Sequence, residues 1–230
     1  MPTPDSGLGA AGAAGGAVAD SGMQGVDAGP PCPEPDVALG APLVTLMREA
    51  EDYDYLEPGN ALSSWQLTSE TTTPDVPPDP DGNHWQGASG DAYLEALPDL
   101  TVREGEGDDI GFYPDPGDGI VGYRVNFPQP GTYFIWVRAY PTGGGRDNSV
   151  HVGLDSVFPV SGRALQFPSN PGGWVWSSNK RDCGPNVFGS PNTAFLEVDS
   201  AGEHEVLISL REDGFEFDQW VLTTDVEYRP

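Results

Sequence analysis

Three acidic residues from distant parts of the sequence have the types and spacing to bind a hard metal ion. Glu49 and Glu51 are two residues apart, so in a strand their side chains lie on the same face. Asp218 stands in the segment 215–222, which is otherwise mostly apolar and aromatic. If the first and last strands of the fold are neighbours, the three carboxylates meet. Two such charges about 5 Å apart repel by about 3 kcal/mol at an effective dielectric constant near 20, so a cation between them is favoured.

Calcium suits this set because it is a hard ion that takes carboxylate and carbonyl oxygens as ligands. Acid-rich loops can supply further ligands, and Asp91, in Gly90-Asp91, is the candidate that we add to the three. One alternative stays open. Acids on strand faces are common, so Glu49 and Glu51 can be a solvated face while Asp218 pairs with Arg211.

Tryptophan residues near turns are the candidates for binding a sugar, because sugar recognition needs an aromatic platform with planar polar partners. Two of the six tryptophans share one face of the segment 171–176, and another stands in a loop. The alternative is that the pair in 171–176 only covers the core. The candidate residues for carbohydrate binding are Trp85, Trp174, Trp176, Asn83 and Asn179.

Strands joined by turns must position these residues. In 119–127 apolar and polar side chains alternate, and 132–140 is dominated by aromatic and β-branched residues. Glycine (31) and proline (24) are frequent, and no stretch of twelve residues has a helical period. These features predict an all-β fold, an antiparallel β-sandwich of the jelly-roll type, with the last two strands joined as a hairpin at 211–214. Further predicted strands are 92–97, 149–154, 173–177, 194–198, 203–210 and 215–223.

Two regions differ from this strand pattern. Residues 1–43 contain no aromatic residue, lysine or arginine and are rich in alanine, glycine and proline, which predicts a disordered linker. They lack the basic and apolar segments of a signal peptide. Residues 44–230 are predicted to form one domain, in which 57–118 consists mostly of loops and places Trp65 in one of them.

The charge of the chain excludes several classes of function. It has 36 acidic and 10 basic residues, a formal charge of -26 and a pI of about 4.1. Such a charge repels nucleic acids and anionic membrane surfaces. No apolar run approaches the roughly 18 residues of a membrane-spanning helix. We expect a monomer with neutral rather than anionic polysaccharides as ligands.

Several motifs together resemble known carbohydrate-binding modules. The sequence resembles modules of families 6 and 35, and it is similar to the C-terminal module of some α-glucuronidases. The resemblance spans most of 44–230 and departs from the usual pattern at 57–84 and 179–192. The motifs that carry it are Glu49-Ala50-Glu51, the segments 131–138 and 215–225, and Arg211-Glu212-Asp213-Gly214-Phe215 with Asp218.

The resemblance implies a galactose-binding-like jelly roll that binds polysaccharide without catalysis. It implies a structural calcium ion joining the N-terminal and C-terminal strands, with Glu49, Glu51 and Asp218 as ligands. It also implies that Trp174 borders the ligand cleft. Such a module belongs to a secreted or cell-surface protein.

Two other functions stay open. A surface adhesion or assembly module can use the same sandwich to bind protein. A glycan-active enzyme is less favoured, because the sequence has no Gly-X-Ser-X-Gly, His-Glu-X-X-His or Walker motif.

Cys32 and Cys183 are the two cysteines. In an oxidising compartment exported proteins seldom keep exposed thiols, so we predict a disulfide between them. The alternative is two cysteines that are free or separately paired.

Overall fold

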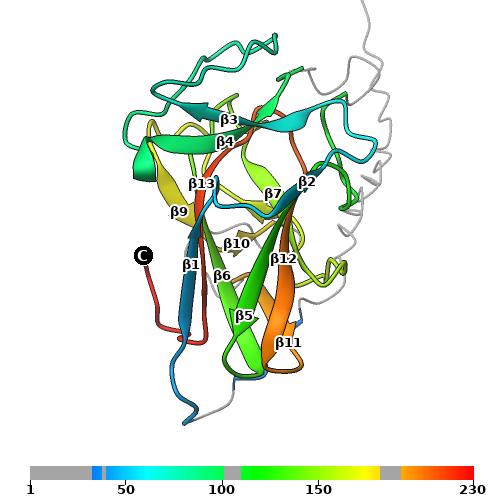
Figure 1. Cartoon of the computed structure of the whole chain (residues 1–230), viewed down its shortest axis with the longest axis vertical. Coiled ribbons are helices and arrows are strands. Elements are labelled where there is room, and N and C mark those ends of the chain that lie inside the picture. The colour runs from blue at the N-terminus through cyan, green and yellow to red at the C-terminus, as the bar shows by residue number, and fades with distance from the viewer. Residues whose placement is uncertain (1–32, 38–39, 101–109, 182–192) are drawn as a thin grey trace, which may run out of the picture.

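The fold is a sandwich of two antiparallel β-sheets, as the sequence predicts (Figure 1). The computed structural model describes residues 33–37, 40–100, 110–181 and 193–230. The strands are β1 (Thr45–Glu49), β2 (Tyr55–Glu57), β3 (Ser64–Ser69), β4 (Ala92–Leu97), β5 (Ile120–Phe127), β6 (Gly131–Ala139), β7 (Ser149–Leu154), β8 (Leu165–Gln166), β9 (Val175–Ser177), β10 (Asn179–Lys180), β11 (Phe195–Val198), β12 (Gly202–Leu210) and β13 (Glu216–Thr223), and a short 3-10 turn, η1 (Ser89–Asp91), precedes β4.

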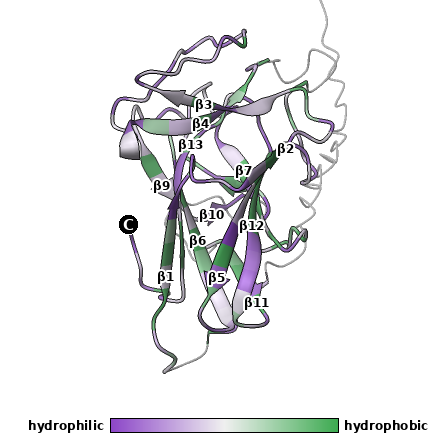
Figure 2. Cartoon of the chain, viewed as in Figure 1, coloured by the Kyte–Doolittle hydropathy of each residue, from purple (hydrophilic) through white to green (hydrophobic). Residues whose placement is uncertain are grey.

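The seven-stranded sheet has the order β11-β6-β13-β4-β3, with β1 also paired to β13 and β9 also paired to β6. The six-stranded sheet has the order β10-β8-β7-β12-β5-β2. Apolar and polar residues alternate along β5 (Figure 2). Val121 and Tyr123 on its inner face are fully buried, while Arg124 on the other face is exposed. The alternation therefore places the core between the sheets.

Aromatic rings fill this core. Trp220 meets Tyr123 edge-on with ring centroids 5.5 Å apart, and Phe217 lies 6.1 Å from Trp65. Trp65 was expected in a loop, but it lies in β3, is buried, and donates a hydrogen bond from its indole nitrogen to the Gly119 carbonyl oxygen at 2.7 Å. The expectation failed because β3 is short and is preceded and followed by turn residues.

The predicted hairpin at 211–214 is wrong. β12 belongs to the six-stranded sheet and β13 to the seven-stranded sheet, so the connection crosses from one sheet to the other. The Gly214 amide donates to the Ala96 carbonyl oxygen at 2.8 Å, and Glu212 forms a β-bridge with Phe112. These contacts hold the connection against the end of β4 and against the loop that contains Phe112, instead of closing a tight turn.

The first and last strands lie side by side, as the sequence predicts. β1 pairs antiparallel with β13, with Glu49 opposite Gln219, and the Ala50 amide donates to the Asp218 carbonyl oxygen at 2.7 Å. Both ends of the domain therefore meet in the seven-stranded sheet.

The last part of the predicted linker touches the domain. The Thr132 hydroxyl donates to the Asp36 carbonyl oxygen at 2.8 Å, and the Gln129 amide donates to the Pro42 carbonyl oxygen at 2.8 Å. Residues 1–32 lie outside the described residues. Within the described part of the chain, no helix has the length and apolar character needed to cross a membrane.

Candidate functional site

A seam between β1, β13 and η1 brings together the acids that the sequence singled out as metal ligands. Ser89 of η1 donates from its amide to Asp218 Oδ1 at 2.8 Å and from its hydroxyl to Glu49 Oε1 at 3.1 Å. The Gln219 side chain donates to the same Glu49 oxygen at 2.8 Å. Glu51 follows β1 in a turn and not in the strand.

Two carboxylate oxygens in this seam have no hydrogen-bond partner. They are Oε2 of Glu49 and Oε2 of Glu51, and both are buried. Burial, together with the neighbouring carboxylates of Glu49 and Asp218, raises the pKa of Glu51 to about 7. Gly90 of η1 lies against Glu51, since a Cβ on this glycine would be 3.0 Å from Glu51 Oε1. The seam is therefore an oxygen-rich place with unsatisfied negative charge.

Asp218 has a cationic partner that the sequence did not identify. The Arg138 guanidinium forms an ion pair with its carboxylate and also donates to the Gly87 carbonyl oxygen at 3.0 Å. The alternative pairing with Arg211 is wrong, because the cation that pairs with Asp218 is Arg138, and Arg211 forms an ion pair with Glu212 at 2.9 Å. Burial raises the pKa of Asp218 to about 6, although Arg138 lowers it.

Asp91, the fourth predicted ligand, ends η1 with its side chain exposed. Its turn therefore borders the seam, and the neighbouring Gly90 is the residue that lies against Glu51.

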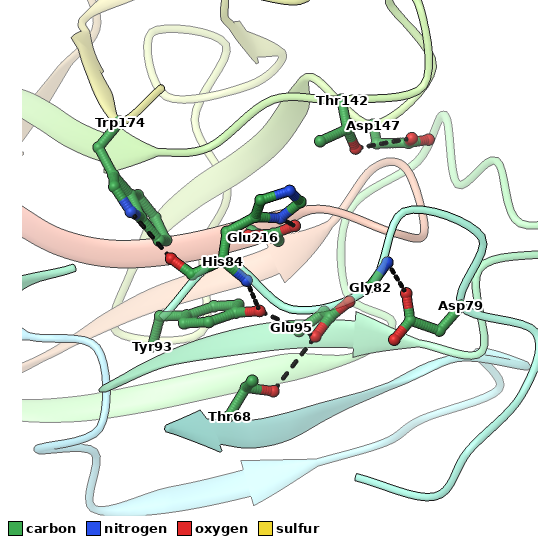
Figure 3. A network of polar contacts seen from close by, with 10 residues as sticks. All are labelled: Thr68, Asp79, Gly82, His84, Tyr93, Glu95, Thr142, Asp147, Trp174 and Glu216. Atoms are coloured by element: carbon green, nitrogen blue, oxygen red, sulfur yellow. Dashed lines mark hydrogen bonds and ion pairs between the residues drawn. The ribbon is translucent and has the colours of Figure 1, made fainter. Parts of the chain in front are cut away.

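Trp174 stands at the centre of a group of aromatic side chains next to this seam. Its ring meets Tyr93 and Tyr140 edge-on, at centroid distances of 5.3 and 5.5 Å. Arg138 lies over the ring at 5.6 Å. The indole nitrogen donates to the His84 carbonyl oxygen at 3.2 Å (Figure 3). These contacts fix the orientation of the ring while leaving the residue half-buried.

The other predicted sugar-binding tryptophans lie in the same neighbourhood. Trp85 is half-buried in the loop between His84, whose carbonyl oxygen accepts from Trp174, and Gly87, where a Cβ would lie 3.6 Å from the Trp174 ring. Trp176 lies in β9, directly opposite Arg138 of β6, and is half-buried. Trp174 and Trp176 thus both lie next to Arg138, and Trp85 belongs to the loop that lies against Trp174.

The two predicted asparagines lie in different surroundings. Asn83 is exposed in the same loop as Trp85. Asn179 belongs to β10 of the six-stranded sheet and is 7% exposed, and its side-chain amide has no hydrogen-bond partner. Asn179 is therefore separated from the surface on which Asn83 lies.

A buried polar network lies beside Trp174 (Figure 3). His84 Nδ1 contacts Glu216 Oε1 at 2.6 Å, and the His84 ring stacks on Tyr140 at 3.9 Å. The Tyr93 hydroxyl accepts from the His84 amide at 2.9 Å and donates to Glu95 at 3.3 Å. Burial, followed by nearby acids, raises the pKa of Glu216 to about 10 and that of Glu95 to about 8.

Sequence reasoning missed this network, although one signal was present. Glu216 stands two residues before Asp218 in the same apolar segment, where an isolated carboxylate is costly to bury. Tyr93 and Glu95 alternate with Leu94 along β4, which places them on the outer side of the sheet.

Three groups of titratable residues in the described part of the chain have ligand atoms that all lie within 4.8 Å of one another. The Glu49, Glu51 and Asp218 set is not one of them. The groups are Asp81 with His84 and Glu216, Asp79 with Asp81 and Glu95, and Asp99 with Asp147 and Asp213.

Cys32 and Cys183 both lie outside the described residues. The disulfide between them therefore stays a prediction.

One curated protein is similar in sequence to most of the chain. "Uncharacterized protein P23" of Formosa agariphila is 40% identical over 188 residues, which cover 80% of this chain. The chain spans only 45% of the length of that relative. No protein-family model matches the sequence.

Solved structures with a similar arrangement of strands include carbohydrate-binding modules. A family 35 carbohydrate-binding module from Clostridium thermocellum is 14% identical, with a TM-score of 0.42, and the match covers 78% of this chain and 97% of that one. The family 35 module of Cellvibrio japonicus Abf62 is 14% identical, with a TM-score of 0.36, and the match covers 69% of this chain and 91% of the module. A Podospora anserina mannanase with a family 35 module is 14% identical, with a TM-score of 0.43, over 81% of this chain and 28% of the mannanase.

Proposed function

We propose that this chain is a non-catalytic carbohydrate-binding module of a secreted or cell-surface protein, with a neutral polysaccharide as its ligand. The observation that supports it most is the pair of half-buried tryptophans, Trp174 and Trp176, beside Arg138, with half-buried Trp85 in the adjoining loop. Half-buried indole rings offer a flat apolar face to a sugar ring, and polar groups at their edge fix its orientation.

Trp174 is held ready for such a ligand. Tyr93 and Tyr140 contact its ring, and its indole nitrogen is already bonded to the His84 carbonyl oxygen. A ring with fixed orientation loses little side-chain entropy when a ligand stacks on it. Exposed Asn83, in the adjoining loop, offers an amide to sugar hydroxyl groups. The formal charge of -26 favours neutral over anionic glycans.

Removing the rings is expected to weaken binding. Affinity electrophoresis through gels containing soluble neutral polysaccharides measures the dissociation constant. We expect Trp174→Ala and Trp176→Ala each to raise it at least about tenfold, the equivalent of about 1.4 kcal/mol or more. Tyr55→Ala is the matched control, because this half-buried ring lies in β2 of the other sheet. The proposal fails if the intact chain is retarded by none of the polysaccharides, or if the tryptophan variants migrate like wild type.

Calcium at the seam is the second part of the proposal. The residues fit a hard cation in one respect, since Glu49 and Glu51 each have a buried oxygen without a partner. They fit less well in another, because both oxygens of Asp218 already contact Arg138 and Ser89. We propose Glu49 and Glu51 as the main ligands, with Asp218 as a further ligand. The ion supplies positive charge that offsets the repulsion between the carboxylates where β1, β13 and η1 meet.

Calcium is therefore expected to raise the melting temperature of the chelator-treated chain. At a concentration one hundred times the dissociation constant, binding contributes about 2.7 kcal/mol, which for a chain of this size is a rise of roughly 5–10 °C. Differential scanning calorimetry in calcium and in chelator measures it. Glu51→Gln is expected to reduce the rise, whereas Glu203→Gln, at an exposed position of β12, is not. An unchanged rise in Glu51→Gln would rule out the seam as the site.

A further inference from the structure

Three aspartates from separate loops meet at a place that the proposed function does not use. Asp99 follows β4, Asp147 precedes β7, and Asp213 lies in the connection from β12 to β13. They are 1%, 1% and 5% exposed. One carboxylate oxygen from each lies within 4.8 Å of the others.

The distances between these carboxylate oxygens match the spacing of ligands around a calcium ion. A calcium ion lies about 2.4 Å from each oxygen ligand, so two oxygens on the same ion are at most about 4.8 Å apart. All three side chains in the group are carboxylates, with no histidine or cysteine. Such ligands select a hard cation over zinc or copper.

An unpaired oxygen gives independent support for a ligand. Asp147 Oδ2 accepts a hydrogen bond from the Thr142 hydroxyl at 3.2 Å. Its other oxygen, Oδ1, is buried without a hydrogen-bond partner. A buried carboxylate oxygen without a partner is costly, and a bound cation removes that cost.

The backbone is shaped to make room for the carboxylates. Gly111, Gly143 and Gly214 have φ of 87°, 57° and 65°, a region that glycine adopts most readily. A Cβ on Gly143 would lie 1.8 Å from Asp147 Oδ2, and one on Gly111 would lie 2.1 Å from Asp213 Oδ2. A Cβ on Gly214 would lie 2.9 Å from Asp99 Cγ. Each loop thus passes close to a carboxylate at a residue that has no side chain.

The electrostatic environment agrees with this geometry. Burial, together with the neighbouring Asp99, raises the pKa of Asp147 to about 8 and that of Asp213 to about 7. Without a cation, these groups tend to hold protons at neutral pH. A divalent ion allows them to ionise together.

We propose that Asp99, Asp147 and Asp213 bind a hard divalent cation of the calcium type, which ties together the loop after β4, the loop before β7 and the connection from β12 to β13. The ligands are distinct from Glu49, Glu51 and Asp218. The proposal is therefore independent of both the sugar ligand and the calcium at the seam.

Isothermal titration of the chelator-treated full chain with calcium chloride tests the site. We expect Asp147→Asn and Asp213→Asn each to bind one calcium ion fewer than wild type, or to bind that ion at least about a hundredfold more weakly. Asparagine keeps the shape and removes the charge, so both variants are expected to fold. Asp115→Asn, at an exposed loop position, is the control and is expected to bind as wild type does. Glu51→Gln is expected to keep the ion at the three aspartates, which separates this site from the seam.

Thermal melting gives a second readout, because the difference in melting temperature between Asp147→Asn and wild type is expected to change sign between chelator and calcium. In chelator, Asp147→Asn is expected to melt about 2–4 °C above wild type, because wild type must take up a proton at Asp147 or bury its charge on folding, and asparagine requires neither. In excess calcium it is expected to melt below wild type. Unchanged calcium stoichiometry and affinity in both aspartate variants, or a melting difference of the same sign in both buffers, would overturn the proposal.

Discussion

Replacing Arg138 by leucine is expected to lower the free energy of unfolding by about 3–5 kcal/mol. Asp218, its ion-pair partner, is 0% exposed, so the variant leaves a buried carboxylate without its cation. The variant also loses the hydrogen bond to the Gly87 carbonyl oxygen and the cation over the Trp174 ring. Urea denaturation in chelator measures the change.

Two further variants distinguish charge pairing from a general loss of packing. Arg124→Leu removes a pair with Glu205 whose side chains are 56% and 36% exposed and whose atoms are 3.8 Å apart, so its effect is expected to stay within about 0.5 kcal/mol. Adding Asp218→Asn to Arg138→Leu is expected to recover much of the loss, because no buried charge is then left alone. If the double variant is as unstable as Arg138→Leu, the ion pair is not the cause.

Arg138 also connects the two parts of the proposed function. Its guanidinium contacts Asp218 in the acidic seam, and it lies over the Trp174 ring of the aromatic group. A cation at the seam would therefore act on a residue that borders the sugar platform. The acidic seam and the aromatic group are therefore neighbours on the seven-stranded sheet, and Arg138 contacts both.

Much of the fold follows from local sequence. Alternation in β5 and β6 predicts which residues face the core, because the side-chain period of a strand is two. The prediction of a hairpin at 211–214 was wrong for a physical reason. Turn residues indicate that the chain changes direction. Whether the next strand joins the same sheet depends on long-range pairing, and here β13 pairs with β6, β4 and β1.

The candidate site was predictable where it depends on strand order. Glu49 and Asp218 meet because β1 and β13 pair, as expected for the first and last strands of such a sandwich. Arg138 was not predictable as the partner of Asp218, because this contact requires the register between β6 and β13, which has a bulge between Phe217 and Gln219. Asp99, Asp147 and Asp213 resemble ordinary loop acids in sequence, and only the folded loops bring them together.

Glu95 is expected to make the folded chain less stable as the pH rises. Burial, and then the nearby Glu216 and Asp79, raise its pKa from 4.5 to about 8. Between these two values the folded state holds a proton that the unfolded state has lost, so the free energy of unfolding decreases with increasing pH. The side chain is 1% exposed, and the shift corresponds to a loss of about 3 kcal/mol between pH 5 and pH 8. Urea denaturation at both pH values, in chelator, measures it.

Neutral variants isolate this contribution. Glu95→Gln keeps the size of the side chain, leaves its Thr68 and Tyr93 neighbours in place, and removes the titrating group. Between pH 5 and pH 8 the free energy of unfolding of this variant is therefore expected to decrease by about 3 kcal/mol less than that of wild type. Glu203→Gln, at an exposed position of β12, is expected to show the full pH dependence of wild type. An equal pH dependence in Glu95→Gln and wild type would mean that Glu95 is already ionised at pH 5 in the folded chain, which would require a cation or a rearranged network around it.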